Sequence, residues 1–255
     1  MKRILILSAN PHDTARLRLD QEVRDIDDGL RQSSQRDQFE LINQGAVRLR
    51  DFRRHMARIK PQIVHFSGHG GGDHGIVLEN NDGKAQFLQT EQIAEMFRLF
   101  VSKGLECVVL NACYSEVQAK AINQFVPYVI GMNQAIGDKA AIEFAIAFYE
   151  TLGEGDTVEF SFDLAKSQLI GLKESQKLVL LTNSAVKDQL QQEPAAASET
   201  AEKESSDSGI SSINLSDSSG TILNPGGKSS ITQQFGNTTN INTGGGDYAG
   251  GNISK

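Results

Sequence analysis

Two apolar runs, each followed by a reactive side chain, constrain what this chain can fold into. The first run covers residues 63–67, and His69 follows it within a glycine-rich stretch. The second run covers residues 107–110, and Cys113 follows it. Short continuous apolar runs are typical of parallel strands that are buried on both faces. Because sites of open α/β sheets are built at the carboxyl ends of strands, we expect His69 and Cys113 to lie at one edge of a sheet.

Strand and helix patterns alternate along most of the chain. Further apolar strands are expected at residues 4–7, 39–42, 128–130 and 178–181. Between the strands, apolar residues recur every three or four positions, as on the buried face of a helix. One such stripe consists of Leu19, Val23, Ile26 and Leu30. A hairpin is expected over residues 75–88, around the turn signal Asp82-Gly83. The alternation predicts an α/β fold with a mostly parallel sheet of about six strands and helices on both faces.

The thiol of Cys113 and the imidazole of His69 are the parts of a cysteine nucleophile site. Cys113 is expected where a strand ends and a helix begins, and the amides of a helix N-terminus favour an anion there. The alternative is that Cys113 is a small buried residue. Cys107 lies inside an apolar run and is interpreted as inert packing. Both thiols are expected to be free, because two cysteines along one strand do not easily form a disulfide.

Three histidines fall close together, and their positions differ in kind. His65 lies inside the apolar run and is expected to be a core histidine bonded to backbone. His74 lies in a glycine-rich loop and is expected to be solvated. His69 follows the strand end, which is the position of a catalytic base. Metal binding is the alternative for this cluster, but a carboxylate or third ligand at helical spacing is missing, so no metal is predicted.

Three short motifs carry a resemblance to a known family. They are SANP at residues 8–11, FSGHG at 66–70 and LNACYS at 110–115. Together they look like the caspase-like cysteine peptidases, most closely the bacterial group called CHAT domains, along residues 1 to about 185. In caspases the histidine precedes a Q-A-C-type cysteine by about 50 residues; here His69 precedes Cys113 by 44. The resemblance implies a caspase-like fold, a Cys113–His69 dyad and no cofactor.

The same resemblance implies an oxyanion hole. The backbone N–H groups of Gly70 and Cys113 do that work in the family, and a glycine lets the backbone approach the tetrahedral intermediate without a Cβ in the way. The alternative is that residues 70–72 form only a flexible glycine loop.

Asn111 is the first candidate for the substrate pocket. Caspases hold a glutamine at this place, two residues before the cysteine, and it helps to shape the pocket for the residue before the cut. Relatives directed at arginine and lysine hold an acid there, so Asn111 gives no support for a basic preference at this position. Asp138 can supply a charge to the pocket or cap a helix. Ser8 and Asn10, which leave the first strand at the same sheet edge, complete the candidates.

The composition changes after Gln192 and divides the chain into three parts. Residues 1–190 are assigned to the peptidase domain and residues 191–208 to a disordered linker. Residues 209–255 form a low-complexity tail rich in Ser, Asn, Thr and Gly, which can stack as cross-β ladders. Its end, GDYAGGNI at 246–253, is similar to short amyloid-signalling motifs of bacterial cell-death effectors. A plain disordered tail is the alternative.

Composition also limits the partners and the compartment. The 255 residues carry a net charge of −7 and no basic run, which argues against nucleic-acid binding. No apolar run approaches the length of a membrane span. The apolar run near the N-terminus, at residues 4–7, is too short for a signal-peptide core. Free thiols indicate a reducing compartment, so a cytoplasmic protein is expected.

The sequence therefore predicts a caspase-like cysteine endopeptidase that acts on a protein or peptide. We expect an effector of a bacterial stress, immune or cell-death pathway, switched by assembly through residues 209–255 or by a sensor protein. One alternative is a catalytically silent caspase-like scaffold whose tail mediates signalling assembly. Another is a receiver-like or nucleotide-binding α/β domain, which the lack of a phosphate-binding glycine pattern disfavours.

Overall fold

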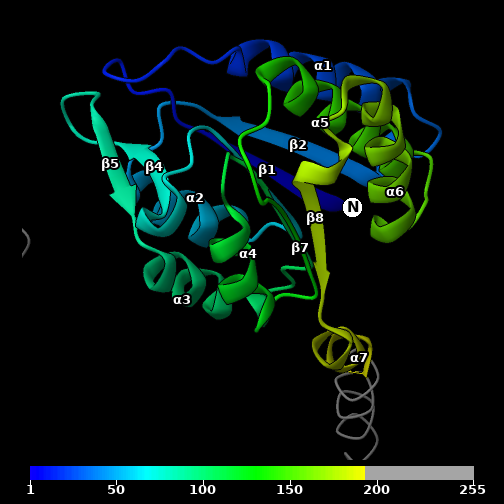
Figure 1. Ribbon diagram of the computed structural model, residues 1–255. Coiled ribbons are helices and arrows are strands. Elements are labelled where there is room, and N and C mark those ends of the chain that lie inside the picture. Colours follow the sequence, from blue (N-terminus) through cyan, green and yellow to red (C-terminus); the bar gives the residue numbers. More distant parts are fainter. Residues whose placement is uncertain (193–255) are drawn as a thin grey trace, which may run out of the picture. The chain divides into compact units, whose positions relative to one another are not determined.

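The computed structural model describes residues 1–192, so the expectations for the tail, and for all but the start of the linker, lie outside the described residues. A six-stranded sheet of order β2-β1-β3-β6-β7-β8 forms the centre of this part of the chain (Figure 1). Neighbouring strands run parallel, except that β8 is antiparallel to β7. The predicted α/β fold with a mostly parallel sheet of about six strands is confirmed.

The strands of the sheet are β1 Lys2–Ser8, β2 Phe39–Gln44, β3 Ile63–Ser67, β6 Cys107–Asn111, β7 Tyr128–Met132 and β8 Leu178–Thr182. The expected hairpin is also present, as the antiparallel pair β4 Ile76–Glu79 and β5 Ala85–Leu88. The α-helices are α1 Leu19–Gln32, α2 Leu49–Ile59, α3 Thr90–Val101, α4 Glu116–Asn123, α5 Asp138–Gly153, α6 Val158–Gln168 and α7 Ser184–Gln192. None of the helices within residues 1–192 has the length and apolar character needed to cross a membrane.

Helices cover both faces of the sheet, with α1, α5 and α6 on one face and α2, α3 and α4 on the other (Figure 1). Each face holds its own apolar cluster. Strand β3 contributes side chains to both clusters, because successive side chains of a strand point to opposite faces. Val64 and Phe66 pack on the α2 side, and Ile63 packs on the α1 side. This two-sided burial explains why the strand reads as a continuous apolar run.

Helix α1 carries an acidic side chain on its buried face. Leu19, Ile26 and Leu30 are buried as expected, whereas Val23 is only partly buried. Glu22, with 2% of its surface exposed, is buried in the same stripe. It lies three residues after Leu19 and four before Ile26, which puts it on the same side of the helix. Val23 still packs against the apolar cluster on this face, so the predicted stripe is present, and the carboxyl group of Glu22 faces the sheet within it.

Helix α5 begins at Asp138, but Asp138 does not cap it. Gly137 occupies the N-cap position and has no side chain with which to make a capping hydrogen bond. The carboxylate of Asp138 instead pairs with Nε of Arg18, which lies just before α1, at 2.7 Å. The helix-cap interpretation of Asp138 is therefore not realised, and the residue ties the starts of α1 and α5 together.

Candidate active site

The register of β3 and β6 brings the two predicted catalytic residues to the same edge of the sheet. Ser67 at the end of β3 pairs with Asn111 at the end of β6, and the N–H of Gly68 donates to the carbonyl of Asn111 at 3.3 Å. His69 follows Ser67 by two residues, as Cys113 follows Asn111. Neighbouring strands are about 4.8 Å apart, so the two chain segments leave the sheet side by side.

Beyond the strands, Gly70 lies directly against Cys113. An ideal Cβ on Gly70 would be 1.9 Å from the carbonyl oxygen and 3.2 Å from the nitrogen of Cys113, so only a glycine fits there. The neighbouring N–H groups of Gly71 and Val77 bond to Gly75 and His69. Within residues 1–192, however, the N–H groups of Gly70 and Cys113 donate no hydrogen bond. Two free backbone donors therefore lie close together next to the thiol.

The imidazole of His69 is held by the backbone of the loop after β1. Its Nε2 lies 2.7 Å from the carbonyl oxygen of Ala15. A carbonyl only accepts hydrogen bonds, so Nε2 carries the proton and Nδ1 remains an acceptor. This bond fixes the tautomer of a ring that stands, partly buried, at the edge of the sheet.

Asn10 stabilises the loop that carries Ala15. Its side-chain amide donates to the carbonyl of Leu17 at 3.0 Å, and its Oδ1 accepts from the N–H of Leu17 at 3.2 Å. The N–H of Asn10 donates in turn to Glu79 at 3.1 Å. The side chain of Asn10 is thus occupied in closing the loop 10–17, which positions the partner of His69.

Cys113 lies in the turn between β6 and α4. Its thiol is partly exposed and is 3.8 Å from the carbonyl oxygen of Ile136. The next residue, Tyr114, has a φ of +57°, a conformation that costs energy for a residue with a side chain and that clusters at functional sites. Ser115 anchors the turn, because its hydroxyl donates to Leu110 at 3.1 Å and accepts from the N–H of Met132 at 3.0 Å.

Cys107 differs from Cys113 as predicted. It is fully buried in the cluster on the α1 side, and burial raises the pKa of its thiol far above the ordinary range. A thiol that stays protonated in an apolar core is not a nucleophile. His74 is exposed, also as predicted, and its ring lies 5.8 Å from that of Phe87.

A narrow hollow of about 50 Å³ opens beside Cys113. It lies between the segment that leads into α1, the ends of β3, β6 and β7, and the start of α5. Asn111 and Asp138, two of the substrate-pocket candidates, line it together with Cys113, and so does Glu22, which the sequence interpretation missed. Ser8 and Asn10 instead line a neighbouring hollow of about 420 Å³. The structure therefore groups Asn111 and Asp138 with Cys113 but places Ser8 and Asn10 in a separate depression.

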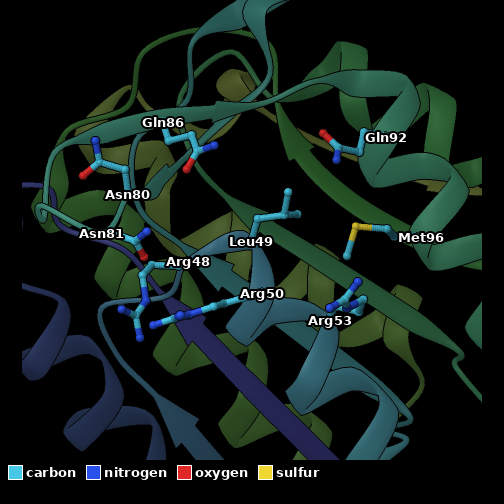
Figure 2. Close-up of a pocket in the computed structure, with 9 residues that line it drawn as sticks. All are labelled: Arg48, Leu49, Arg50, Arg53, Asn80, Asn81, Gln86, Gln92 and Met96. Atoms are coloured by element: carbon cyan, nitrogen blue, oxygen red, sulfur yellow. The ribbon is translucent and has the colours of Figure 1, made fainter.

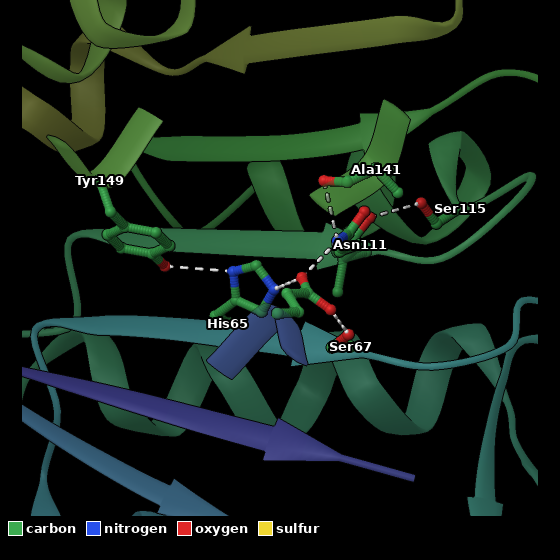
Figure 3. A network of polar contacts seen from close by, with 8 residues as sticks. His65, Ser67, Asn111, Ser115, Ala141 and Tyr149 are labelled. Atoms are coloured by element: carbon green, nitrogen blue, oxygen red, sulfur yellow. Dashed lines mark hydrogen bonds and ion pairs between the residues drawn. The ribbon is translucent and has the colours of Figure 1, made fainter. Parts of the chain in front are cut away.

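A buried network of polar side chains (Figure 3) includes Ser67 and Asn111, which also line the narrow hollow. Oε1 of Glu22 accepts from Nδ2 of Asn111 at 2.5 Å and lies 3.0 Å from Nε2 of His65, while Oε2 accepts from the hydroxyl of Ser67. Nδ1 of His65 lies 3.2 Å from the hydroxyl of Tyr149, whose pKa burial raises well above its usual value. His65 is a core histidine, but its partners are side chains rather than the predicted backbone.

A much larger hollow of about 500 Å³ lies elsewhere, between α2, α3 and the hairpin (Figure 2). Three arginines line it, Arg48, Arg50 and Arg53. Nε of Arg48 pairs with Asp51 at 2.6 Å, and this hydrogen bond lowers the pKa of the Asp51 carboxyl. Neither His69 nor Cys113 lines this hollow, so size alone does not identify the site.

A family model described as the CHAT domain matches residues 3–205. The chain is 28% identical over 174 residues, or 66% of its length, to a Roc-COR-CHAT protease from an unknown prokaryotic organism. It is 26% identical over 156 residues, or 61% of its length, to a probable protease of Gillisia limnaea. These matches span only 16% and 28% of the two relatives, so this chain corresponds to a small part of each.

The fold also resembles a solved structure, a secreted C11 cysteine protease from Bacteroides thetaiotaomicron in complex with an irreversible peptide inhibitor. The TM-score is 0.53 at 12% sequence identity, and the match covers 73% of this chain and 67% of that one. The chain therefore has a caspase-like fold. Since the family model covers most of the sequence, the chain belongs to the CHAT domain family.

Proposed function

We propose that this protein is a cysteine endopeptidase with Cys113 as nucleophile and His69 as base. The contact between Gly70 and Cys113 carries the proposal, because it sets two N–H groups that have no acceptor among residues 1–192 beside a partly exposed thiol. This is the donor arrangement that stabilises the oxyanion of a tetrahedral intermediate. The caspase-like fold and the protease relatives support the same reaction class.

The reaction begins when the thiol loses its proton to Nδ1 of His69, which the bond from Nε2 to Ala15 leaves as an acceptor. The sulfur of Cys113 then attacks the peptide carbonyl, and the N–H groups of Gly70 and Cys113 bind the oxyanion. When the intermediate collapses, the C–N bond breaks and His69 gives its proton to the leaving amine. Water, deprotonated by His69, then hydrolyses the thioester and restores the thiol.

A peptide-library cleavage profile of the wild type against Cys113→Ala tests this activity. We expect cleavage by the wild type and none by Cys113→Ala or by wild type treated with iodoacetamide. Cleavage that survives in Cys113→Ala would assign the chemistry to another residue. A wild-type protein that cleaves no peptide in the library, at low or at high protein concentration, would favour the catalytically silent scaffold.

We further propose that the peptidase is an effector in a bacterial stress or cell-death response and is switched by assembly. The sequence of residues 209–255 supports this proposal, because self-association of a tail raises the local concentration of the domain attached to it. The expected result is that deletion of residues 209–255 lowers cleavage at low protein concentration and that the isolated tail peptide forms thioflavin-binding fibrils. Phe235→Lys with Ile241→Lys should prevent the fibrils, and a peptide that stays monomeric for days would contradict the assembly switch.

A further inference from the structure

The hollow beside Cys113 has an acidic floor and apolar walls. Glu22 and Asn111, 2% and 7% exposed, form its floor. Leu17, Leu19, Ile136 and Ile142 are among the apolar residues that line it. Its position next to the thiol is where the side chain of the substrate residue before the cut, P1, would enter. A floor of this kind therefore bears directly on which P1 residue is accepted.

The floor offers hydrogen-bond acceptors and no spare donor. Both protons on Nδ2 of Asn111 have partners, Glu22 at 2.5 Å and the carbonyl of Ala141 at 3.4 Å, so the amide orientation is set by the carboxyl group of Glu22. Oδ1 of Asn111 is consequently left buried without a partner among the described residues. The Glu22 carboxyl group accepts three hydrogen bonds of the about four that two carboxylate oxygens can take.

The charges around the hollow are also acidic. Within residues 1–192, Glu22 has no lysine or arginine partner, and its one ion-pair contact is with His65. Asp138 lines the same hollow, and its partner Arg18, half exposed, does not. An acidic P1 side chain would therefore meet two carboxyl groups, whereas a basic one would meet acceptors that still lack donors. A buried acceptor without a donor is costly, and a bound N–H group removes that cost.

We propose that this hollow is the P1 pocket of the peptidase and takes a basic side chain. The aliphatic stem of lysine or arginine packs on the apolar walls, and its head donates to Oδ1 of Asn111 and to Glu22. The acidic residue of this pocket, Glu22, lies in α1. The residue type at position 111 alone therefore gave no indication of a basic P1 preference. This inference rests on the proposed protease function, and it makes Glu22 and Asn111 specificity-determining residues.

Two pairs of matched peptides test the inference with full-length protein. Lysine is compared with norleucine, which keeps the stem and lacks the ammonium, and arginine with citrulline, which keeps the shape and lacks the charge. We expect kcat/KM to be about tenfold or more higher for each basic member, as a charge-assisted hydrogen bond would give. Equal or faster cleavage of norleucine and citrulline, or a preference for acidic P1, would overturn the basic pocket and leave the peptidase intact.

Binding to Cys113→Ala separates the pocket from the chemistry. Fluorescence polarisation with the same peptides should give tighter binding of the basic member of each pair even if turnover is absent. Tighter binding without any cleavage by the wild type would support the pocket and refute the proposed peptidase. Equal binding of all four peptides would refute the pocket.

Variants assign the preference to Glu22. Glu22→Gln should reduce the lysine-to-norleucine ratio about tenfold, and Asn111→Leu should reduce it as well. Asp28→Asn is the matched control, because it removes a carboxylate from an exposed position of the same helix and should leave the ratio unchanged. If Glu22→Gln does not fold, Asp138→Asn, at a partly exposed position, replaces it with the same expected direction. An unchanged ratio in every folded pocket variant would contradict the assignment.

Discussion

The backbone of Gly70 touches that of Cys113, although 43 residues separate them in the chain; a Cβ on Gly70 would lie 1.9 Å from the Cys113 carbonyl oxygen. The contact joins the loop after β3 to the turn after β6 just beyond the last paired residues, Ser67 and Asn111. The proposed oxyanion donors thus depend on one glycine and on the register of two strands.

Gly70→Ala should abolish most activity without unfolding the domain. The added methyl group must displace the Cys113 backbone, and loss of one oxyanion donor costs about 10²–10³-fold in kcat. Gly171→Ala is the matched control, since a Cβ there meets no atom within 4 Å. Peptide cleavage and thermal unfolding should be measured for both variants. A Gly70→Ala protein with wild-type kcat would show that this close contact does not matter for the reaction.

The two thiols should react with iodoacetamide at very different rates. We expect Cys113 to be alkylated at neutral pH much faster than Cys107, because Cys113 is partly exposed and Cys107 is fully buried with a raised pKa. Peptide mapping by mass spectrometry measures both rates in one sample. His69→Ala should slow the labelling of Cys113 and leave Cys107 unchanged. Faster labelling of Cys107 in the folded protein would reverse the assignment of the nucleophile.

Asn10→Ala should lower kcat more than it raises KM. The side chain of Asn10 makes both of its bonds to Leu17 and so holds the loop whose Ala15 carbonyl fixes His69. We expect a fall in kcat of about tenfold, since small displacements of catalytic groups are costly. A rise in KM at constant kcat would instead indicate direct contact with the substrate, as the sequence interpretation of Asn10 as a pocket residue implied.

The stability of the domain should fall in alkali partly because of Cys107. Burial raises the pKa of this thiol above its ordinary 9.0, so the folded state keeps a proton that the unfolded state loses. The protonated thiol makes its full contribution to the free energy of unfolding below about pH 9. As the pH rises further, that contribution falls by at most about 1.4 kcal/mol per pH unit. Urea unfolding from pH 8 to 10.5 should therefore give a shallower decline for Cys107→Val than for the wild type. Identical slopes would show that the buried thiol does not contribute.

Local periodicity carries the information that could be predicted from the sequence. Strands β3 and β6 and the dyad candidates at their ends could be read from apolar runs, because burial on both faces leaves a continuous signal. Helix α7 was not predicted, since Val186 and Leu190 are its only large apolar residues. Glu22 was missed because a charged helical residue is normally assumed to face solvent. Its spacing from Leu19 and Ile26 was the available signal.

Contacts that depend on loop geometry were beyond a reading of the sequence. The bond from His69 to Ala15 joins residues 54 apart in the chain, and no periodic pattern encodes it. The separation of Asn10 from the Cys113 hollow has the same cause. Residues that leave one sheet edge together can still enter different depressions, because the loop that follows the strand decides where each side chain goes.

The antiparallel direction of β8 decides how this domain can be joined to other polypeptide. Thr182 at the end of β8 pairs with Tyr128 at the start of β7, so the chain leaves the sheet at the edge where β1 begins, opposite the edge that carries Cys113. The start of β1 and the end of β8 therefore lie on the same side of the sheet. Neighbouring ends of this kind are found in domains that tolerate insertion into another protein. A domain whose first strand begins and last strand ends on the side opposite Cys113 can be joined to other polypeptide there without covering the edge that carries Cys113.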